Sequence, residues 1–398
     1  MRCLPIRPDQ LLRLWVAVAG VFVAGCGGSS GDAPPAPDPP PQEEPLEPGP
    51  EVLNDTGVAR VACYAMAGDD LVDCADASAR DLSPVQDGMT GRDATAPDDS
   101  DGRLGFSFEP VPRRSGGLHD LTECVRDNVT GKVWEGKGDA TSPRPGSRAF
   151  LNDPVDPAGN DVTRHVAAVN AERLCGFADW RLPTVLELQG LVDYGRPGPG
   201  FRLDPVWFPN LSAAVKHAWT SDALGTGDAS AVWTVDLTTG YPVPASRRPG
   251  FDVGARLVRG GRPAPAGPRF VFTVGSNEVL DALAGLTWRR CTFGSVIDVT
   301  NCGSGSFFMT HEQALRFTRN STDWRVPNIK ELSTLVDRSR TPPLRFSSAF
   351  PNLTTNGTFY WTSTPAPDGP GQVLVTGFRD GELAAHPRAA GAFLLLVK

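Results

Sequence analysis

Two stretches of this sequence place a tryptophan, an arginine and a glutamate in the same order and at the same spacing. Carboxylates can transfer protons or bind a metal ion, an arginine fork can bind a sulfate or carboxylate, and an indole ring can stack on a sugar. These candidate residues are Trp180, Arg181, Glu187, Trp324, Arg325 and Glu331.

Helix capping explains the two glutamates without a catalytic role. Thr184 lies three residues before Glu187, and Asn328 lies three residues before Glu331. In a capping box the residue before a helix accepts a hydrogen bond from the third helical N–H, and the side chain at that third position bonds back. We therefore interpret both glutamates as caps rather than as catalytic or metal-binding carboxylates.

The arginines and tryptophans also have a structural interpretation. We expect Arg181 and Arg325 to hold a buried carboxylate, such as Asp193 or Asp337, rather than an anionic sugar. Most tryptophans recur at matching positions in the two halves of the chain, which favours packing in the core over stacking on sugars. They are Trp134, Trp180, Trp219, Trp233, Trp288, Trp324 and Trp361.

No other segment carries a familiar catalytic motif. The sequence has no Gly-x-Ser-x-Gly elbow, no His-Glu-x-x-His pair, no phosphate loop and no dinucleotide fingerprint. The acidic run at residues 98–102 lacks the ligand order of an EF-hand, so we interpret it as a solvated loop. The histidines lack ligand spacing; they are His119, His165, His217, His311 and His386. We predict no catalytic residue, no metal and no cofactor, and hence a protein that is not an enzyme.

The first residues have the order of a bacterial lipoprotein signal. Arg2 and Arg7 precede a short apolar run, and Val23-Ala24-Gly25-Cys26 then matches a lipobox. We predict a signal peptide at residues 1–25 and lipidation of Cys26; the alternative is an ordinary signal peptide with a chance cysteine. Because Gly27 does not favour inner-membrane retention, we expect an outer-membrane lipoprotein, on the periplasmic face or the cell surface. Residues 26–50 are rich in proline and predict a disordered linker.

The remaining cysteines suit an oxidising compartment. They are Cys63, Cys74, Cys124, Cys175, Cys291 and Cys302. Six cysteines allow fifteen connectivities, so the pairing stays open. Local spacing favours Cys63 with Cys74 and Cys291 with Cys302, which leaves Cys124 with Cys175. We expect the first pair to brace a small hairpin within residues 51–117.

The chain contains a domain-sized repeat of about 144 residues. The Trp-Arg-x-Pro stretches align, and the order of the matches continues on both sides. The matching segments are 130–134 with 284–288, 191–193 with 335–337, 208–211 with 350–353, and 219–221 with 361–363. We therefore predict two tandem copies of one domain, at residues 118–262 and 270–398.

Each copy has the sequence pattern of an α+β domain, with two helices before a twisted set of antiparallel strands. The expected helices cover residues 165–174 and 312–318, the latter capped by Thr310 and Gln313, and begin again after Thr184 and Asn328. The expected strands are residues 218–221, 231–237 and 255–259, and residues 359–363, 373–378 and 392–397. Thr239-Gly240 and Asp380-Gly381 are the predicted hairpin turns.

These segments resemble the Lcl C-terminal domain family, named for the Legionella collagen-like protein. The resemblance rests on residues 127–134, 179–188 and 219–221, and covers roughly residues 118–261 and 275–398. It implies a C-type-lectin-like fold, related to that of formylglycine-generating enzymes, and an exported protein; adhesion to sulfated glycosaminoglycans is described for the namesake. This chain departs from the namesake because it lacks a collagen repeat and is acidic. It also lacks the late reactive cysteine pair of the formylglycine-generating relatives.

The composition narrows the choice of partner. The net charge is −8 and no basic block occurs, which argues against nucleic acid binding. We therefore predict a surface-exposed lipoprotein that acts as a binding or adhesion module for a glycan or a protein, and contacts the membrane through its lipid. The alternatives are an envelope structural or assembly protein, or an enzyme of unrecognised mechanism. Any ligand site is expected in the loops at residues 194–207 or 240–251; the oligomeric state stays open.

Overall fold

The computed structural model describes residues 47–95, 100–156, 158–196, 198–225, 229–298, 301–321, 323–338, 348–353, 358–367 and 369–398. All of these belong to one compact unit, Pro39–Lys398. The predicted signal peptide, Cys26, most of the proline-rich linker, and Asp98 and Asp99 of the acidic run lie outside the described residues. Asp101 of that run is described, and its carboxylate accepts a hydrogen bond from Ser107.

Copy 1 contains two four-stranded sheets. The first has the order β10-β5-β4-β3, with β3 at Phe108–Pro110, β4 at Cys124–Asp127, β5 at Lys132–Glu135 and β10 at Val258–Gly260. The second has the order β8-β7-β6-β9, with β6 at His217–Ala223, β7 at Ala231–Asp236, β8 at Pro242–Ser246 and β9 at Val253–Gly254. Neighbouring strands are antiparallel except β6 and β9, which are parallel.

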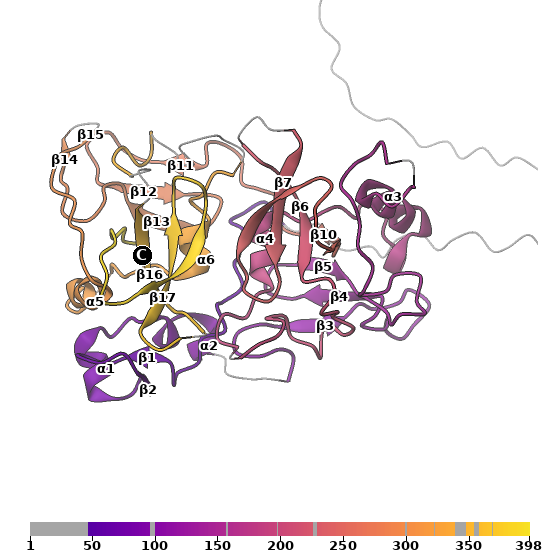
Figure 1. Ribbon diagram of the computed structural model, residues 1–398. Coiled ribbons are helices and arrows are strands. Elements are labelled where there is room, and N and C mark those ends of the chain that lie inside the picture. The colour runs from indigo at the N-terminus through magenta and orange to yellow at the C-terminus, as the bar shows by residue number, and fades with distance from the viewer. Residues whose placement is uncertain are drawn as a thin grey trace, which may run out of the picture. The chain divides into compact units, whose positions relative to one another are not determined.

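Copy 2 also contains two main sheets, each with three strands instead of four. One sheet has the order β11-β12-β13, with β11 at Phe270–Val271, β12 at Glu278–Asp281 and β13 at Leu286–Arg289. The other has the order β16-β17-β18, with β16 at Phe359–Pro365, β17 at Gln372–Gly377 and β18 at Leu383–Pro387. A small hairpin joins β14 at Ile297–Asp298 to β15 at Asn301–Cys302. Figure 1 shows the strands of this copy in orange and yellow.

The predicted hairpin turns are confirmed. Gly240 lies between β7 and β8 with φ of 79°, and Gly381 lies between β17 and β18 with φ of 73°, a region that disfavours other residues. The strands β8 and β18 that follow these turns were not predicted. Residues 392–397 do not form the expected strand; they make isolated bridges instead.

The helices begin at capped residues. In copy 1, α3 covers Val162–Glu172 and α4 covers Val185–Gly190; in copy 2, α5 covers His311–Thr318 and α6 covers Ile329–Ser333. The start of α3 lies three residues before the predicted one because the side chain of Asp161 caps it. The predicted capping box of Thr310 and Gln313 is confirmed. Figure 1 shows α4 beside β6 and β7, and α6 beside β16 and β17.

The segment before copy 1 carries more structure than the predicted hairpin. Strand β1 at Cys63–Tyr64 pairs with β2 at Leu71–Val72, and the disulfide Cys63–Cys74 closes this hairpin, as expected. Two helices, α1 at Ala77–Leu82 and α2 at Gly91–Thr95, and a 3-10 turn at Asp87–Met89 follow. Strand β3 pairs with β4, so the sheet of copy 1 begins before residue 118.

Matching tryptophans form the centres of the two cores. Trp134 and Trp219 are buried in copy 1, and Trp288 and Trp361 are buried at the corresponding positions of copy 2. The indole N–H of Trp219 donates to the carbonyl oxygen of Phe150, and that of Trp361 donates to a carbonyl oxygen in the same way, both at 2.8 Å. Truncation of one such ring typically costs about 3–5 kcal/mol.

The equivalent helices of the two copies pack against each other. Helices α4 and α6 are in contact, and Val192 and Tyr194 of copy 1 share one apolar cluster with Ile329, Leu374 and Leu383 of copy 2. The described parts of the two copies therefore bury apolar surface together.

Candidate functional site

The candidate arginine and glutamate of copy 1 form a bidentate ion pair. The Nη1 and Nη2 atoms of Arg181 lie 2.8 and 2.7 Å from the carboxylate oxygens of Glu187. The same carboxylate accepts the backbone N–H of Thr184 at 2.8 Å, while the Thr184 hydroxyl accepts the N–H of Glu187 at 3.1 Å. Burial raises the pKa of Glu187, but the hydrogen bonds from Arg181 and the charge of Lys132 have the larger, opposite effect. The pKa of Glu187 is therefore below its usual value.

Copy 2 repeats this arrangement. Arg325 donates to Glu331 at 2.7 and 2.5 Å, and Asn328 closes the capping box. The predicted caps are therefore confirmed in both copies. We call each unit, made of the arginine, the glutamate and the cap, an Arg–Glu clamp.

Each arginine holds a buried carboxylate, as predicted, but the residues named for that role are wrong. Arg181 and Arg325 pair with the capping glutamates and not with Asp193 or Asp337. Asp193 is nearly buried and pairs instead with Arg103, at 2.5 Å. The reason is geometric, because the capping glutamate lies only six residues after the arginine, so one carboxylate satisfies both the cap and the guanidinium.

Trp180 and Trp324 differ although their clamps match. Trp180 is buried, and its indole N–H donates to the carbonyl oxygen of Leu174 at 3.1 Å. Trp324 is only half-buried, which corrects the expectation that it packs in the core. Its ring is covered by the charged ends of Arg289, at 3.9 Å, and Lys398, at 4.8 Å.

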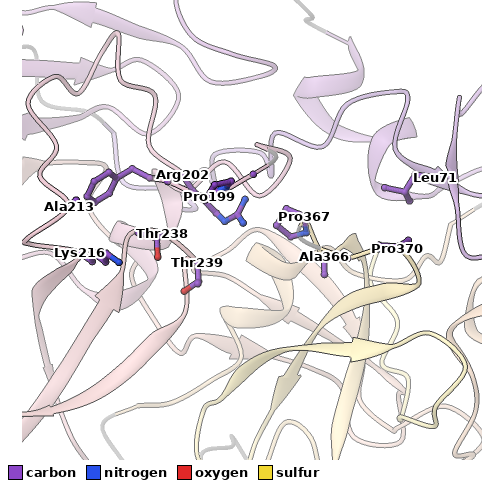
Figure 2. A pocket seen from close by; sticks show the side chains of 14 residues that line it. Leu71, Pro199, Arg202, Ala213, Lys216, Thr238, Thr239, Ala366, Pro367 and Pro370 are labelled. Carbon is purple, nitrogen blue, oxygen red and sulfur yellow. The ribbon is translucent and has the colours of Figure 1, made fainter.

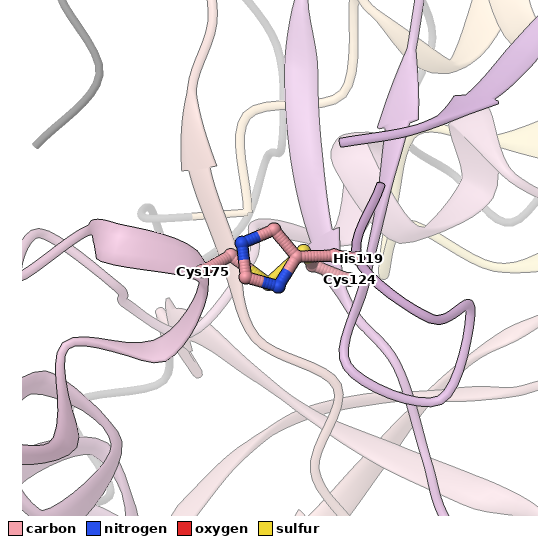
Figure 3. A group of neighbouring side chains, drawn as sticks. All are labelled: His119, Cys124 and Cys175. Atoms are coloured by element: carbon pink, nitrogen blue, oxygen red, sulfur yellow. A yellow bond between two sulfur atoms is a disulfide. The ribbon is translucent and has the colours of Figure 1, made fainter. Parts of the chain in front are cut away.

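One group of side chains has the spacing of a metal site. His119, Cys124 and Cys175 place their ligand atoms within 4.8 Å of one another, the single such group found in the described residues. Figure 3 shows the imidazole of His119 beside the sulfur–sulfur bond of the two cysteines. Metal binding requires thiolates, and a disulfide sulfur carries no such charge. The Nδ1 atom of His119 also lies 3.3 Å from a carboxylate oxygen of Glu123. We therefore interpret the group as a disulfide with a neighbouring histidine.

The six cysteines pair as local spacing suggests. The disulfides are Cys63–Cys74, Cys124–Cys175 and Cys291–Cys302. The second links β4 to the turn after α3, and the third closes the loop that carries β14 and β15.

An open groove of about 1100 Å³ lies among the described residues. Copy 1 contributes residues 198–202, 213, 216 and 238–239; copy 2 contributes residues 366–367 and 369–370; Leu71 comes from the disulfide hairpin. Figure 2 shows Lys216, Thr238 and Thr239 on one side, with Ala366 and Pro367 on the other. Part of this lining comes from the loop at residues 194–207, where a ligand site was predicted.

The lining of the groove contains side chains that can bind a ligand. Phe201, Thr238 and Thr239 are half-exposed and Lys216 is exposed. Together they provide one aromatic face, two hydroxyl groups and one cation. Among the described residues of the lining there is no carboxylate, histidine or cysteine. The arrangement can therefore stack on and hydrogen-bond to a ligand.

A buried charged cluster lies in copy 1, centred on Glu135. One carboxylate oxygen of Glu135 contacts Lys137 Nζ at 2.8 Å and His165 Nε2 at 3.1 Å, and the other accepts the backbone N–H of Leu257 at 3.0 Å. Arg256 donates to the backbone oxygen of Glu135 at 2.8 Å. Burial alone would raise the pKa of Glu135, but Lys137 and His165 hold it far below its usual range.

The sequence did not identify this cluster, although a signal was present. Aligning the copies on Trp134 and Trp288 sets Lys137 opposite Cys291. Val258 and Val397 bridge to the two clamp arginines in the same way, which sets Arg256 opposite Leu395. Where a charged residue of one copy is equivalent to a neutral residue of the other, the cores of the two copies have diverged.

A second buried group lies where the N-terminal segment meets both copies. Lys330 of α6 donates to the backbone oxygens of Asp55 at 2.5 Å and Gly190 at 2.9 Å. Burial lowers its pKa to about 8, although Asp55 and other carboxylates oppose that shift. Asp87 and Asp93 lie in the same region, and burial followed by the charge of Asp55 raises the pKa of each carboxyl.

The clamps, the capped helices and the repeated sheets define a tandemly duplicated α+β domain. The family model of the Lcl C-terminal domain matches residues 123–259 and 277–398. The chain therefore belongs to this family and carries two copies of its domain. A search of curated proteins finds no match. Within the described part of the chain, no helix has the length and apolar character needed to cross a membrane.

Proposed function

We propose that this protein is a non-enzymatic binding or adhesion module for a glycan, held at the cell surface by a lipid on Cys26. The groove carries the proposal. It has the size of a small-molecule or oligosaccharide site, and its lining combines the ring of Phe201, two threonine hydroxyls and the ammonium of Lys216.

Family membership and composition support the same proposal. Each copy has two helices and mostly antiparallel strands, in keeping with the C-type-lectin-like fold that the family implies. Three disulfides suit an exported protein. The negative net charge of −8 disfavours nucleic acid as the ligand.

A glycan array probed with the purified protein tests the groove. We expect a defined set of glycans to bind, and Phe201→Ala to weaken that binding by about tenfold because stacking is lost. Phe317→Ala is the matched control, since Phe317 is an exposed ring outside the groove. If no glycan binds, or if both variants bind equally well, the groove is not a glycan site.

Labelling with a fatty acid tests the anchor. Cys26→Ser should abolish incorporation of the label and release the protein from the outer-membrane fraction, because the acyl chains supply the membrane affinity. Retention of the label in this variant would contradict the lipoprotein assignment.

A protein ligand of the cell envelope is the second candidate, and a patch on copy 2 favours it. Phe307, Phe308 and Phe317 are each more than half exposed, and Phe307 and Phe317 both pack against Phe293. Aromatic side chains gathered on a surface are typical of protein interfaces. Crosslinking in the native envelope should then depend on Phe307 and Phe317, and Phe201→Ala becomes the control.

A further inference from the structure

A small cavity adjoins the buried charged cluster of copy 1. Its volume is about 30 Å³, room for one or two water-sized particles and too little for a tetrahedral oxyanion. Its lining includes Lys137, Arg148, Asn210, His217 and Arg256. Every ionisable side chain of the lining is therefore basic.

The buried charges at this cavity do not balance. Lys137 and Arg256 are both almost completely buried, and Glu135 is the buried carboxylate that faces them. That carboxylate is already engaged by Lys137, His165 and a backbone N–H. Arg144 adds a further cation at 4.0 Å but also pairs with the exposed Glu172. One buried positive charge is thus left over, which is costly without a counter-charge.

Arg256 is the least compensated of these cations, because Glu135 acts on it without a direct ion pair. It makes one hydrogen bond, to a backbone oxygen, and among the described residues its Nε atom has no partner and no carboxylate lies within ion-pair distance. The ring of Phe208 covers the guanidinium at 5.1 Å. Arg290 of copy 2 is equally buried, yet its guanidinium donates to three backbone oxygens. Backbone oxygens can therefore satisfy a buried guanidinium of this fold completely, as they do not at Arg256.

The second copy supplies an internal comparison. The position of Lys137 is taken by Cys291, which is disulfide-bonded, and the position of Arg256 is taken by Leu395. Both cations are replaced by neutral groups in the copy that lacks the Glu135 cluster.

We propose that the cavity beside Arg256 and Lys137 binds one small monovalent anion of halide size, such as chloride. The anion supplies the missing negative charge, and donors from Arg256 and Lys137 coordinate it. The site is specific to copy 1 and does not depend on the ligand of the groove.

Halide-dependent stability tests the proposal in solution. At constant ionic strength, replacing gluconate by chloride should raise the melting temperature by about 2–5 °C, because an anion that binds the folded state alone stabilises it. Arg256→Leu introduces the residue type found at the equivalent position of copy 2, Leu395, and should abolish this chloride response. Arg290→Leu is the control, since it removes a buried guanidinium whose partners are all backbone oxygens, and its response should remain.

Crystals grown in bromide give a readout that does not depend on any variant folding. An anomalous peak between Arg256 and Lys137 is the expected result. The proposal is overturned if bromide is absent from this cavity, if chloride leaves the melting temperature unchanged, or if Arg256→Leu responds to chloride like the unmodified protein.

Discussion

The ammonium group of Lys330 in copy 2 lies 2.9 Å from the backbone oxygen of Gly190 in copy 1. It also donates to the backbone oxygen of Asp55 at 2.5 Å and sits 4.7 Å from the ring centre of Phe106. The matching residue of copy 1 is Leu186. The cation of Lys330 thus connects α6 to three segments that are far apart in the sequence, at Asp55, Phe106 and Gly190.

We expect Lys330→Met to lower the free energy of unfolding by about 2–4 kcal/mol, since it leaves two buried carbonyl oxygens without a donor. The apolar part of the side chain is kept, so the loss reflects the hydrogen bonds and the charge of the ammonium group and not a cavity. Chemical denaturation measures the effect.

The control for Lys330 is Leu186→Met, which changes the equivalent position of copy 1 and should cost less than about 1.5 kcal/mol. Equal losses in the two variants would show that Lys330 contributes as an apolar side chain only.

Substitutions in the Arg–Glu clamps can distinguish the contribution of helix capping from that of the ion pair. In Glu187→Gln and Glu331→Gln the side-chain oxygen can still accept the N–H of the cap, as Gln313 does in α5. The bidentate pair with the arginine is lost, so we expect each variant to unfold about 1–3 kcal/mol more easily. Glu172→Gln, at an exposed position, should change stability by less than about 0.5 kcal/mol. A loss of similar size in all three variants would mean that the clamps add nothing.

Local features were predictable from the sequence because their causes lie within a few residues. The capping boxes at Thr184 and Asn328 depend on a spacing of three residues. The hairpin turns depend on a glycine at positive φ, as at Gly240 and Gly381. The closest cysteines form disulfides, which then leaves Cys124 and Cys175 for each other.

Contacts between distant segments were not predictable, although the divergence of the two copies marked single residues that make such contacts. The partner of Asp193 is Arg103, from a segment before the predicted domain. The cluster around Glu135 combines residues from β5, from α3 and from the segment that directly precedes β10. Neither a period nor a spacing rule connects such residues, since tertiary packing brings them together.

The disulfides should differ in their contribution to stability. Cys124–Cys175 closes a loop with a sequence separation of 51, and Cys291–Cys302 closes one with a separation of 11. Loop-closure entropy predicts a loss of about 4 kcal/mol for the double alanine variant of the first and about 3 kcal/mol for that of the second. Denaturation of both under non-reducing conditions measures the order, and a larger loss from the shorter loop would contradict the entropic explanation.

A buried histidine should make copy 2 sensitive to acid. His311 is fully buried between Tyr64 and Trp361, and its Nε2 lies 3.0 Å from the backbone oxygen of Thr362. Burial, together with the charge of Arg388, lowers the pKa of His311 from 6.5 to about 3.

Between pH 6.5 and pH 3 the unfolded chain therefore binds a proton at His311 that the folded protein does not. The stability that this residue contributes is complete above pH 6.5 and is lost as the pH falls, by about 3 kcal/mol between pH 7 and pH 4. Val162 is the first residue of α3 and corresponds to His311, the first residue of α5. The variant His311→Val therefore introduces the residue of copy 1 and should remove this part of the pH dependence. Val162→Leu changes the same helical position in copy 1 and should leave the dependence intact. Urea unfolding of the three proteins from pH 4 to pH 7 gives the comparison, and parallel curves for all three would show that His311 takes up its proton without unfolding.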